Sequence, residues 1–535
     1  MNNLNLSLIN NSKPSNLLIA APLFLAVCFF YFSMTSNDYV VGFLSDDAIY
    51  LIMAEMHSFW EKDFNPVIEH VRPEYHFPPL YPMLLGLMGA DSSSPELASS
   101  ITTFFLISSI FIFGLWVWCE TRSLAPAVLL ALIYSFLPGT IIMSQGLYSE
   151  FLFMCFIYSA FICLSPKNPN KDQWMLAALF LSMASLTRII GIVFIAAYCL
   201  LLILRKPKRS FILGLISAGP IICWTLFRNS LTGKSSYVNE FISAFNQNDD
   251  IINIFIEHLS GQTSILIESI YWIFSCIDGV SNTLSIHLVL IFILVLVSFA
   301  GFIVRLKQKR IDAIIVPLYL GIIYVWPFTG TFFVSRFLFP LMPVFIFYLW
   351  AGKEIFTRIN INQNLMFTLC VIMITYIAYP STNKFINRGF LNIDPELMPY
   401  RRSRAWLLAE TDEIAMHEAI KTKEVISVFK SLQKSVDIQD CIYAFQTPVV
   451  MIYSKRVTEK LPPPTVSDDA FKEKTGHCRY ILATHLVDLD KNYPAFYPLY
   501  RLPDNDDYQT TPYLKNINGT NQAIAFLVEQ TSFKD

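Results

Sequence analysis

Residues 284–304 read LSIHLVLIFILVLVSFAGFIV, and the six residues that follow, 305–310, read RLKQKR. The first run contains no Asp, Glu, Lys or Arg, and it has the length of about 20 apolar residues that a helix needs to cross a bilayer. The second run carries four basic residues, and basic loops gather on the cytoplasmic side of membranes. The two runs together predict a membrane-spanning helix with a cytoplasmic end, and the same pairing recurs along the chain.

The composition of the whole chain agrees with this prediction. The 535 residues are 54% hydrophobic and 15% charged, whereas soluble domains carry roughly 25% charged residues. A formal net charge of -2 provides no basic field for nucleic acid, and the high hydrophobicity excludes a disordered chain. The ten cysteines show no zinc-binding spacing. The sequence therefore predicts a multi-pass membrane protein with no nucleic-acid partner.

We expect an all-α polytopic bundle of about eleven spans, because the chain contains that many apolar runs. They cover residues 17–34, 96–117, 123–141, 148–164, 174–187, 189–204, 211–227, 284–304, 312–328, 333–350 and 365–379. The fifth and sixth runs are short and flank Arg188, so one long span with a buried arginine is the alternative. The first run lacks a flanking cleavage site of small residues, so we interpret it as an anchor and not as a cleaved signal peptide.

The distribution of basic residues sets the orientation of these spans. Basic clusters lie in alternate loops, at 205–209, 305–310 and 353–358 among others. Placing them all in the cytoplasm requires 174–204 to cross twice, and it puts the N-terminus inside and the C-terminus outside. The chain then divides into a membrane domain, 1–379, with outer loops 35–95 and 228–283, and an extracytoplasmic domain, 380–535.

The outer segments have their own predicted elements. The apolar stretch 265–277 suggests helices that lie along the membrane surface. In the polar tail, an amphipathic helix near 410–432 and strand-like runs at 441–445, 480–484 and 523–528 indicate a small α/β domain. Cys441 and Cys478 lie in this tail, which would be oxidising in a bacterial periplasm. They form either a disulfide or two buried free thiols.

The stretch Ser45-Asp46-Asp47-Ala48-Ile49-Tyr50 follows the first span. The mostly apolar residues 48–60 indicate a helix, which places both carboxylates at its N-terminus. There the helix dipole favours the ionised form, which suits a general base. The alternative is a solvated pair of loop acids.

Four further charged residues interrupt apolar runs: Glu150, Arg188, Arg228 and Arg336. Charge at membrane depth suggests a functional site, although each arginine alone could extend its head group to the interface. The predicted topology places these four at the same outer face as Asp46, Asp47 and His76. A pocket of carboxylates and arginines at that depth fits an anionic, lipid-linked substrate, because the planar guanidinium suits phosphate.

A set of motifs appears in a fixed order along residues 1–350. The set comprises Asp46-Asp47, Pro78-Pro79-Leu80-Tyr81, Ser149-Glu150, Leu186-Thr187-Arg188, Arg228-Asn229 with Gly233, and Arg336 with Pro340 and Pro343. In this ordered set the chain resembles the GT-C class of membrane glycosyltransferases, and within it the group of protein O-mannosyltransferases and aminoarabinose transferases.

The resemblance implies a catalytic Asp46 with Asp47 as its acidic neighbour, and a polyprenyl-phosphate sugar as the donor. It implies that Arg188 and Arg336 bind the donor phosphate. The family often has lysine directly before the double proline, where this chain has Phe77. Either His76 takes that role, or phosphate binding depends more on the arginines, Arg228 included. The large lumenal insert of the eukaryotic mannosyltransferases is missing, which favours the cytoplasmic membrane of a bacterium.

The reaction expected from these residues is inverting transfer of a sugar to an acceptor hydroxyl on a lipid, glycan or protein. Asp46 would accept the hydroxyl proton, and Glu150, Tyr50 and Tyr81 would complete the pocket. Asp46, Asp47 and Glu150 could hold a divalent metal, although their spacing does not require one. A lipid or solute transporter is the first alternative, and a membrane-anchored protein whose C-terminal domain does the binding is the second.

Overall fold

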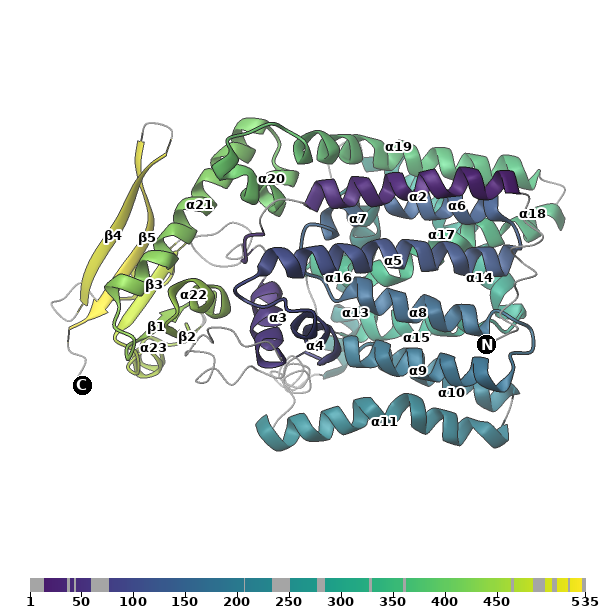
Figure 1. Cartoon of the computed structure of the whole chain (residues 1–535), viewed down its shortest axis with the longest axis horizontal. Helices are drawn as coiled ribbons and strands as arrows, with labels where there is room; N and C mark the ends of the chain where they lie inside the picture. Colours follow the sequence, from purple (N-terminus) through teal and green to yellow (C-terminus); the bar gives the residue numbers. More distant parts are fainter. Residues whose placement is uncertain are drawn as a thin grey trace.

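The computed structural model in Figure 1 contains a long helical bundle and, at one end of it, a smaller part with a β-sheet. It describes residues 14–35, 39–42, 45–58, 77–205, 207–232, 251–276, 284–326, 330–358, 362–462, 466–484, 496–502, 508–517 and 520–531. Helix α19 leads from the bundle towards α20 and α21, which adjoin the sheet (Figure 1).

The helices of the bundle follow the apolar runs of the sequence. They are α2 (Pro14–Thr35), α3 (Ser45–Met56), α4 (Leu80–Leu87), α5 (Pro95–Thr121), α6 (Leu124–Ser135), α7 (Pro138–Met143), α8 (Glu150–Leu164), α9 (Lys171–Thr187), α10 (Gly191–Arg205), α11 (Pro207–Thr232), α13 (Ile251–Ser275), α14 (Leu284–Lys307), α15 (Ile311–Val325), α16 (Thr331–Leu338), α17 (Met342–Ala351), α18 (Lys353–Arg358) and α19 (Gln363–Gly389).

Five segments of the described chain are helical, long and apolar enough to cross a membrane. They are Pro95–Thr121, Ser210–Ser230, Ile286–Lys307, Thr331–Ile355 and Gln363–Gly389. Several shorter apolar helices, such as α8 and α10, lie among them. The chain is therefore a multi-pass membrane protein, as its composition predicts.

Proline divides two of the predicted spans. The run 123–141 forms α6 and α7, because Pro138 begins a new helix after Leu137 in an extended conformation. The run 333–350 forms α16 and α17, joined by the 3₁₀ turn Phe339–Leu341, which contains Pro340. Proline lacks the N–H that a continuous helix requires. Each break lies inside a predicted span, and the second still leaves Thr331–Ile355 long and apolar enough to cross a membrane as one segment.

The run 174–204 is two helices and not one long helix, as predicted. Helix α9 ends at Thr187, and Arg188 follows with the extended backbone angles φ -145° and ψ 134°. Helix α10 starts at Gly191. A Cβ at Gly191 would lie 2.5 Å from the Cα of Ser185, so the tight reversal after Arg188 requires glycine.

The stretch 265–277, expected to form helices lying along the membrane surface, belongs as far as Ser275 to α13. The packing partners of α13 include α7, α15, α16 and α19 in the bundle. Near its C-terminal end the side chains of Tyr271, Trp272 and Phe274 are buried. This end of α13 is therefore part of the bundle core.

The tail folds around one mixed sheet in the order β2-β1-β3-β5-β4. Its elements are α20 (Arg404–Leu408), α21 (Asp412–Ser435), β1 (Cys441–Ala444), α22 (Thr447–Ser454), β2 (Val457–Lys460), α23 (Asp468–Lys474), β3 (Tyr480–Thr484), β4 (Tyr508–Ile517) and β5 (Thr520–Gln530), preceded by the 3₁₀ turn Pro395–Arg402. Strands β2, β1 and β3 are parallel, whereas β5 is antiparallel to both β3 and β4. The predicted helix and all three predicted strands are present, and β2 and β4 are additional.

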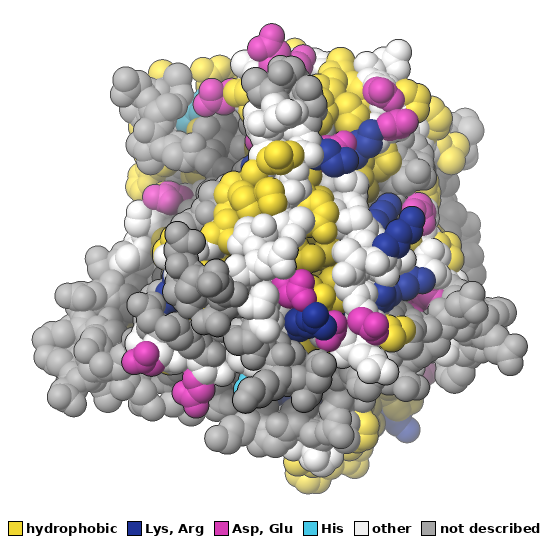
Figure 2. Space-filling model, turned by 90° about the vertical axis from the view of Figure 1, so that its left-hand side faces the viewer, with side chains coloured by type: hydrophobic (Ala, Val, Ile, Leu, Met, Phe, Trp, Pro, Cys, Tyr) yellow, Lys and Arg dark blue, Asp and Glu magenta, His cyan; other side chains and the backbone are white. Residues whose placement is uncertain are grey.

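The sheet end of the molecule carries charges of both signs next to one another (Figure 2). Ion pairs in the tail include Lys423–Glu396, Lys515–Glu424 and Arg479–Glu529. A surface of mixed sign favours solubility without attracting one class of charged partner. This part is therefore suited to an aqueous compartment.

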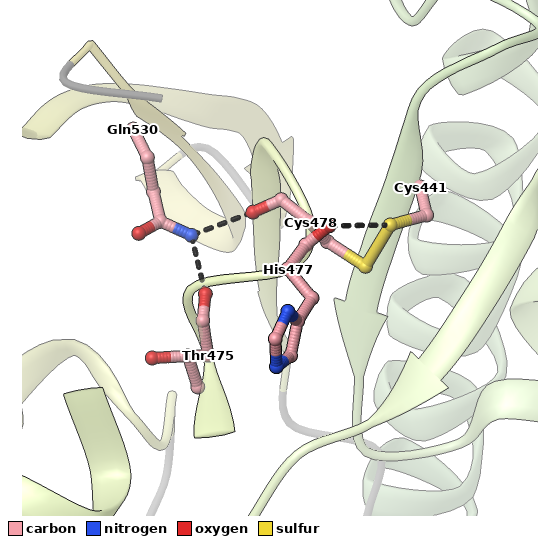
Figure 3. Close-up of a disulfide and its surroundings, with 5 residues drawn as sticks. All are labelled: Cys441, Thr475, His477, Cys478 and Gln530. Carbon is pink, nitrogen blue, oxygen red and sulfur yellow. Dashed lines mark hydrogen bonds between the residues drawn. A yellow bond between two sulfur atoms is a disulfide. The ribbon is translucent and has the colours of Figure 1, made fainter. Parts of the chain in front are cut away.

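Cys441 and Cys478 form a disulfide between the start of β1 and the residues before β3 (Figure 3). The Gln530 side-chain amide donates to the carbonyl oxygens of Thr475 and Cys478. The disulfide joins the start of β1 to the turn after α23, and the Gln530 contacts join the end of β5 to the same turn. Of the two alternatives left by the sequence, the structure contains the disulfide.

A close approach of two helices gives a test of the bundle. A Cβ on Gly301 of α14 would lie 2.0 Å from the backbone oxygen of Tyr348 on α17. We expect Gly301→Ala to lower the free energy of unfolding by about 1–3 kcal/mol or more, because the helices would have to separate. Gly321→Ala on α15 is the matched control, since its Cβ would meet no atom within 4 Å. Equal thermal stability of the two variants in detergent would contradict this packing.

Candidate active site

Helix α3 lies across the end of the bundle that faces the sheet (Figure 1). Asp46 and Asp47 occupy its first turn, as the sequence predicts. Their side chains differ sharply in exposure: that of Asp46 is 23% exposed, whereas Asp47 is fully buried, at 0%. Only Asp46 can therefore meet a ligand directly.

Asp47 holds the loop that precedes α3. The Tyr39 hydroxyl and the Gly42 N–H each donate to its Oδ2 at 3.0 Å, and the Ala48 N–H donates to Oδ1 at 2.6 Å. Burial raises the pKa of Asp47 to about 7, and these hydrogen bonds oppose part of the rise. Asp47 thus fastens the loop that precedes α3 to the first turn of that helix, where Asp46 lies.

A chain of ion pairs joins four residues that the sequence predicts as a site. Arg336 contacts both Asp46 and Glu150. Arg188 Nη1 lies 2.7 Å from Glu150 Oε1 and donates to Ser149 Oγ at 3.3 Å. Glu150 is fully buried, and its Oε2 has no hydrogen-bond partner among the described residues. One carboxylate therefore orients two guanidinium groups.

Each member of this network lies at a helix end. Glu150 is the first residue of α8, where the helix dipole favours a negative charge. Arg188 caps α9 in the reversal before α10, and Arg336 lies in the last turn of α16, before the proline-containing 3₁₀ turn. Helix ends leave backbone groups free for polar contacts, which is why the breaks in the apolar runs coincide with the site.

Aromatic rings cover the arginines. The Arg336 guanidinium carbon lies 4.8 Å from the centre of the Tyr148 ring, and that of Arg188 lies 5.2 Å from the Phe337 ring. Such cation–π contacts are worth about 0.5–2 kcal/mol each. Neither Tyr148 nor Phe337 is among the site residues that the sequence predicts. The only signal in the sequence is that Tyr148 lies two residues before Glu150 and that Phe337 directly follows Arg336.

Tyr50 and Tyr81 both lie beside the network. The Tyr50 hydroxyl is 2.9 Å from Ser149 Oγ, and its ring is in edge contact with the Tyr81 ring at 4.8 Å. The Tyr81 hydroxyl is 2.6 Å from Thr102 Oγ1. Phe77, which directly precedes the double proline, packs against Tyr50 with 4.9 Å between the ring centres. This wall of the site is aromatic.

One predicted site residue of the described chain is not part of the network. Arg228 is buried on α11, outside the ion pairs that connect the other four described residues. His76 lies outside the described residues. The ion pairs among Asp46, Glu150, Arg188 and Arg336 do not involve Arg228.

The tail also contacts the loop before α3. The Tyr453 hydroxyl of α22 donates to the backbone oxygen of Val41 at 3.0 Å. Gly42 has a φ of +114°, and a Cβ there would lie 2.8 Å from Val449 Cγ1. The Arg402 guanidinium carbon lies 4.8 Å from the Tyr39 ring. The tail therefore supports the segment that positions both aspartates.

No protein-family model and no curated protein sequence matches the chain. Among solved structures, the chain is similar to the oligosaccharyltransferase of Archaeoglobus fulgidus, crystallised with a tethered acceptor peptide. The TM-score is 0.50 at 10% sequence identity, and the alignment covers 94% of this chain and 74% of that one. The chain has the GT-C fold.

A second similar structure is that of ArnT from Cupriavidus metallidurans bound to undecaprenyl phosphate, with a TM-score of 0.49 at 10% identity. That alignment covers 98% of this chain and all, 100%, of the other. The GT-C fold predicted from the ordered motifs is confirmed. Likeness at this level of identity concerns the fold alone.

The three carboxylates named as a candidate metal site do not converge within this GT-C fold. Asp46 and Glu150 both contact Arg336, whereas Asp47 binds the preceding loop. Among the described residues, the metal-ligand atoms that cluster within 4.8 Å belong to Cys441, Glu459 and Cys478. The two sulfurs of that group are bonded to each other, so they offer no thiolates.

The buried Asp47 predicts a pH dependence. Its folded pKa of about 7 exceeds the ordinary value of 3.8, so the folded chain keeps a proton that the unfolded chain has lost. The free energy of unfolding should therefore fall as the pH rises from about 4 to about 7, by at most on the order of 4 kcal/mol, and then level off. Thermal unfolding in detergent across this range is the measurement. Asp47→Asn should show a smaller fall, and an unchanged pH profile in that variant would contradict the assignment.

Proposed function

We propose that the protein is an inverting glycosyltransferase that moves a sugar from a polyprenyl-phosphate donor to an acceptor hydroxyl. One observation carries the proposal: a partly exposed carboxylate, Asp46, shares Arg336 with the buried Glu150 at one end of a GT-C bundle. This arrangement offers a base and a phosphate-binding cation at the same place.

The network is electrically balanced without a substrate, since two carboxylates face two guanidinium groups. Glu150 is buried and pairs with both arginines, so a ligand cannot easily replace it. Asp46 is the exposed member. A donor phosphate that approaches Arg336 would therefore compete with Asp46, and binding would release the Asp46 carboxylate from its ion pair.

The released carboxylate is then the general base. Asp46 accepts the proton of the acceptor hydroxyl while the oxygen attacks the anomeric carbon. The bond between that carbon and the phosphate oxygen breaks, and its electron pair leaves with polyprenyl phosphate. Arg188 and Arg336 stabilise the charge that develops on the leaving phosphate. A single displacement of this kind inverts the anomeric centre.

Glu150 acts as a positioning residue in this mechanism. Its Oε1 holds both guanidinium groups, while Oε2 keeps a free lone pair in the described structure. Tyr50 and Tyr81 form the adjacent aromatic wall, against which the apolar face of a sugar ring can pack. His76 and Arg228 remain candidates for further phosphate contacts.

The membrane setting belongs to the same proposal. We place the site at the outer face of a bacterial cytoplasmic membrane, with about eleven spans and the basic loops inside, because the basic clusters alternate along the sequence. The C-terminal part, residues 380–535, which contains the β-sheet and carries surface charges of both signs, then lies outside. The acceptor is a lipid, a glycan or a protein; the similar archaeal enzyme was crystallised with an acceptor peptide.

The first test is Asp46→Asn in the purified full-length protein, supplied with a panel of polyprenyl-phosphate sugars. Release of polyprenyl phosphate should fall by roughly 100-fold or more, because the amide cannot accept the proton. Donor affinity should be kept or improved, because a competitor for Arg336 is gone. Asp47→Asn changes the neighbouring buried carboxyl group in the same way, and it is the control for activity that is lost through a disturbed loop structure. Near-normal turnover in Asp46→Asn would remove this residue from the mechanism.

The second test replaces Arg336 or Arg188 by lysine. Lysine keeps the charge and loses the planar fork, so donor affinity should fall by roughly tenfold while the apparent affinity for acceptor stays unchanged. Arg305→Lys is a matched control, since Arg305 forms a buried ion pair with Asp312 at the other end of the bundle. If the site variants lose only thermal stability, as that control is expected to, the arginines are structural.

A further inference from the structure

A polar cavity lies near α18 and the C-terminal end of α14. Both elements are at the end of the bundle opposite the sheet (Figure 1). The volume of the cavity is about 830 Å³. Its walls come from segments far apart in the sequence, namely the ends of α5, α10 and α14, the turn before α9, and α17 with α18. It is separate from the network around Glu150 and plays no part in the proposed transfer.

The lining of this cavity is strongly basic. Six basic side chains line it, against two acidic ones: Lys167, Arg205, Arg305, Lys309, Arg310 and Lys353, against Glu120 and Glu354. Glu120 is already engaged, because its Oε2 lies 2.6 Å from Arg305 Nη1 and 3.5 Å from Arg310 Nη2. Arg305 is also paired with Asp312, which does not line the cavity. The six basic groups still outnumber these three carboxylates, so the remaining field inside the cavity is positive.

Several of these cations lack a carboxylate partner in the described part of the chain. Arg205 donates only to backbone carbonyls, those of Lys167 at 3.3 Å and Lys309 at 2.9 Å. These bonds bring the two lysine-bearing turns together at the cavity rim. Lys167 and Lys309 are themselves exposed. The rim thus presents positive charge that the protein does not neutralise.

A buried donor accompanies the positive rim. Trp174 lines the cavity and is 2% exposed, and its indole Nε1–H has no hydrogen-bond partner among the described residues. An unsatisfied buried donor costs about 1–3 kcal/mol, so an acceptor from a ligand would stabilise it. Trp350 and Phe347 also line the cavity, and aromatic residues of this kind gather at the level of lipid head groups.

We propose that this cavity binds a phosphate-bearing anion, held as the head group of an anionic phospholipid. The phosphate oxygens would accept from Lys167, Lys309 and the Trp174 indole, and the acyl chains would extend along the apolar helices. Basic pockets between helix ends are suited to such head groups. The aromatic residues and the position at a bundle end favour a lipid over a soluble phosphate.

The test uses the purified full-length chain in detergent and native mass spectrometry of bound lipid. Phosphatidylglycerol should bind more tightly than phosphatidylcholine of the same chain length. The double variant Lys167→Gln/Lys309→Gln should weaken phosphatidylglycerol binding by roughly tenfold or more, because each lysine contributes to the attraction. Both side chains are exposed, so the fold should tolerate the change.

The matched control is Lys171→Gln/Lys307→Gln, which removes two exposed lysines at the same end of the bundle that do not line the cavity. It should leave binding nearly unchanged. An equal loss in the control, or equal binding of the two lipids, would overturn the proposal. Glycerol phosphate supplies the third arm: if it alone binds as tightly and displaces the lipid, the site takes a soluble phosphate and the lipid assignment is wrong.

Discussion

The arrangement of the candidate site depends on the ion pairs of the Glu150 carboxylate. This carboxylate is fully buried, and a buried charge is tolerated only when it is well paired. Its two partners come from different helix ends: Arg188 from the reversal after α9 and Arg336 from the last turn of α16. Arg336 in turn reaches Asp46 on α3. Because Glu150 must be paired, the reversal after α9 and the last turn of α16 have to meet beside it. The start of α3 joins them through Asp46.

The tail contributes to the same site from the other side. Val449 and Tyr453 of α22 contact the loop at Gly42 and Val41, and this loop donates to Asp47 through the Gly42 N–H. The aspartate pair is thus held between the bundle and the tail. A membrane-anchored protein whose tail works independently, the alternative raised by the sequence, would not need these contacts.

The sequence predicts the charged part of this site but only some of its aromatic residues: Tyr50 and Tyr81 are expected in the pocket, whereas Tyr148 and Phe337 are not. Asp46, Glu150, Arg188 and Arg336 are conspicuous because charge is rare in apolar runs, and their order matches a known pattern. Tyr39 and Tyr148 give no such signal, since aromatic side chains are common throughout this chain. The breaks at Pro138 and Pro340 were missed because hydropathy alone does not detect a helix end. Strand β4 was missed for a related reason: its polar residues lack the alternation that marks a half-buried strand.

The two ends of the bundle show how the same charges serve different purposes. Arg305 is enclosed by Asp312 and Glu120, whose side chains are 1% and 4% exposed; every charge in that cluster is neutralised within the protein. Arg336 is enclosed on one side by Glu150, at 0%, but its other partner, Asp46, is 23% exposed. An incoming anion could replace only the exposed partner, because removing a buried one would leave an uncompensated charge. Arg305 has two buried carboxylate partners, whereas Arg336 has one buried and one partly exposed partner. This difference in exposure distinguishes an arginine that can bind a ligand from one in a structural ion pair.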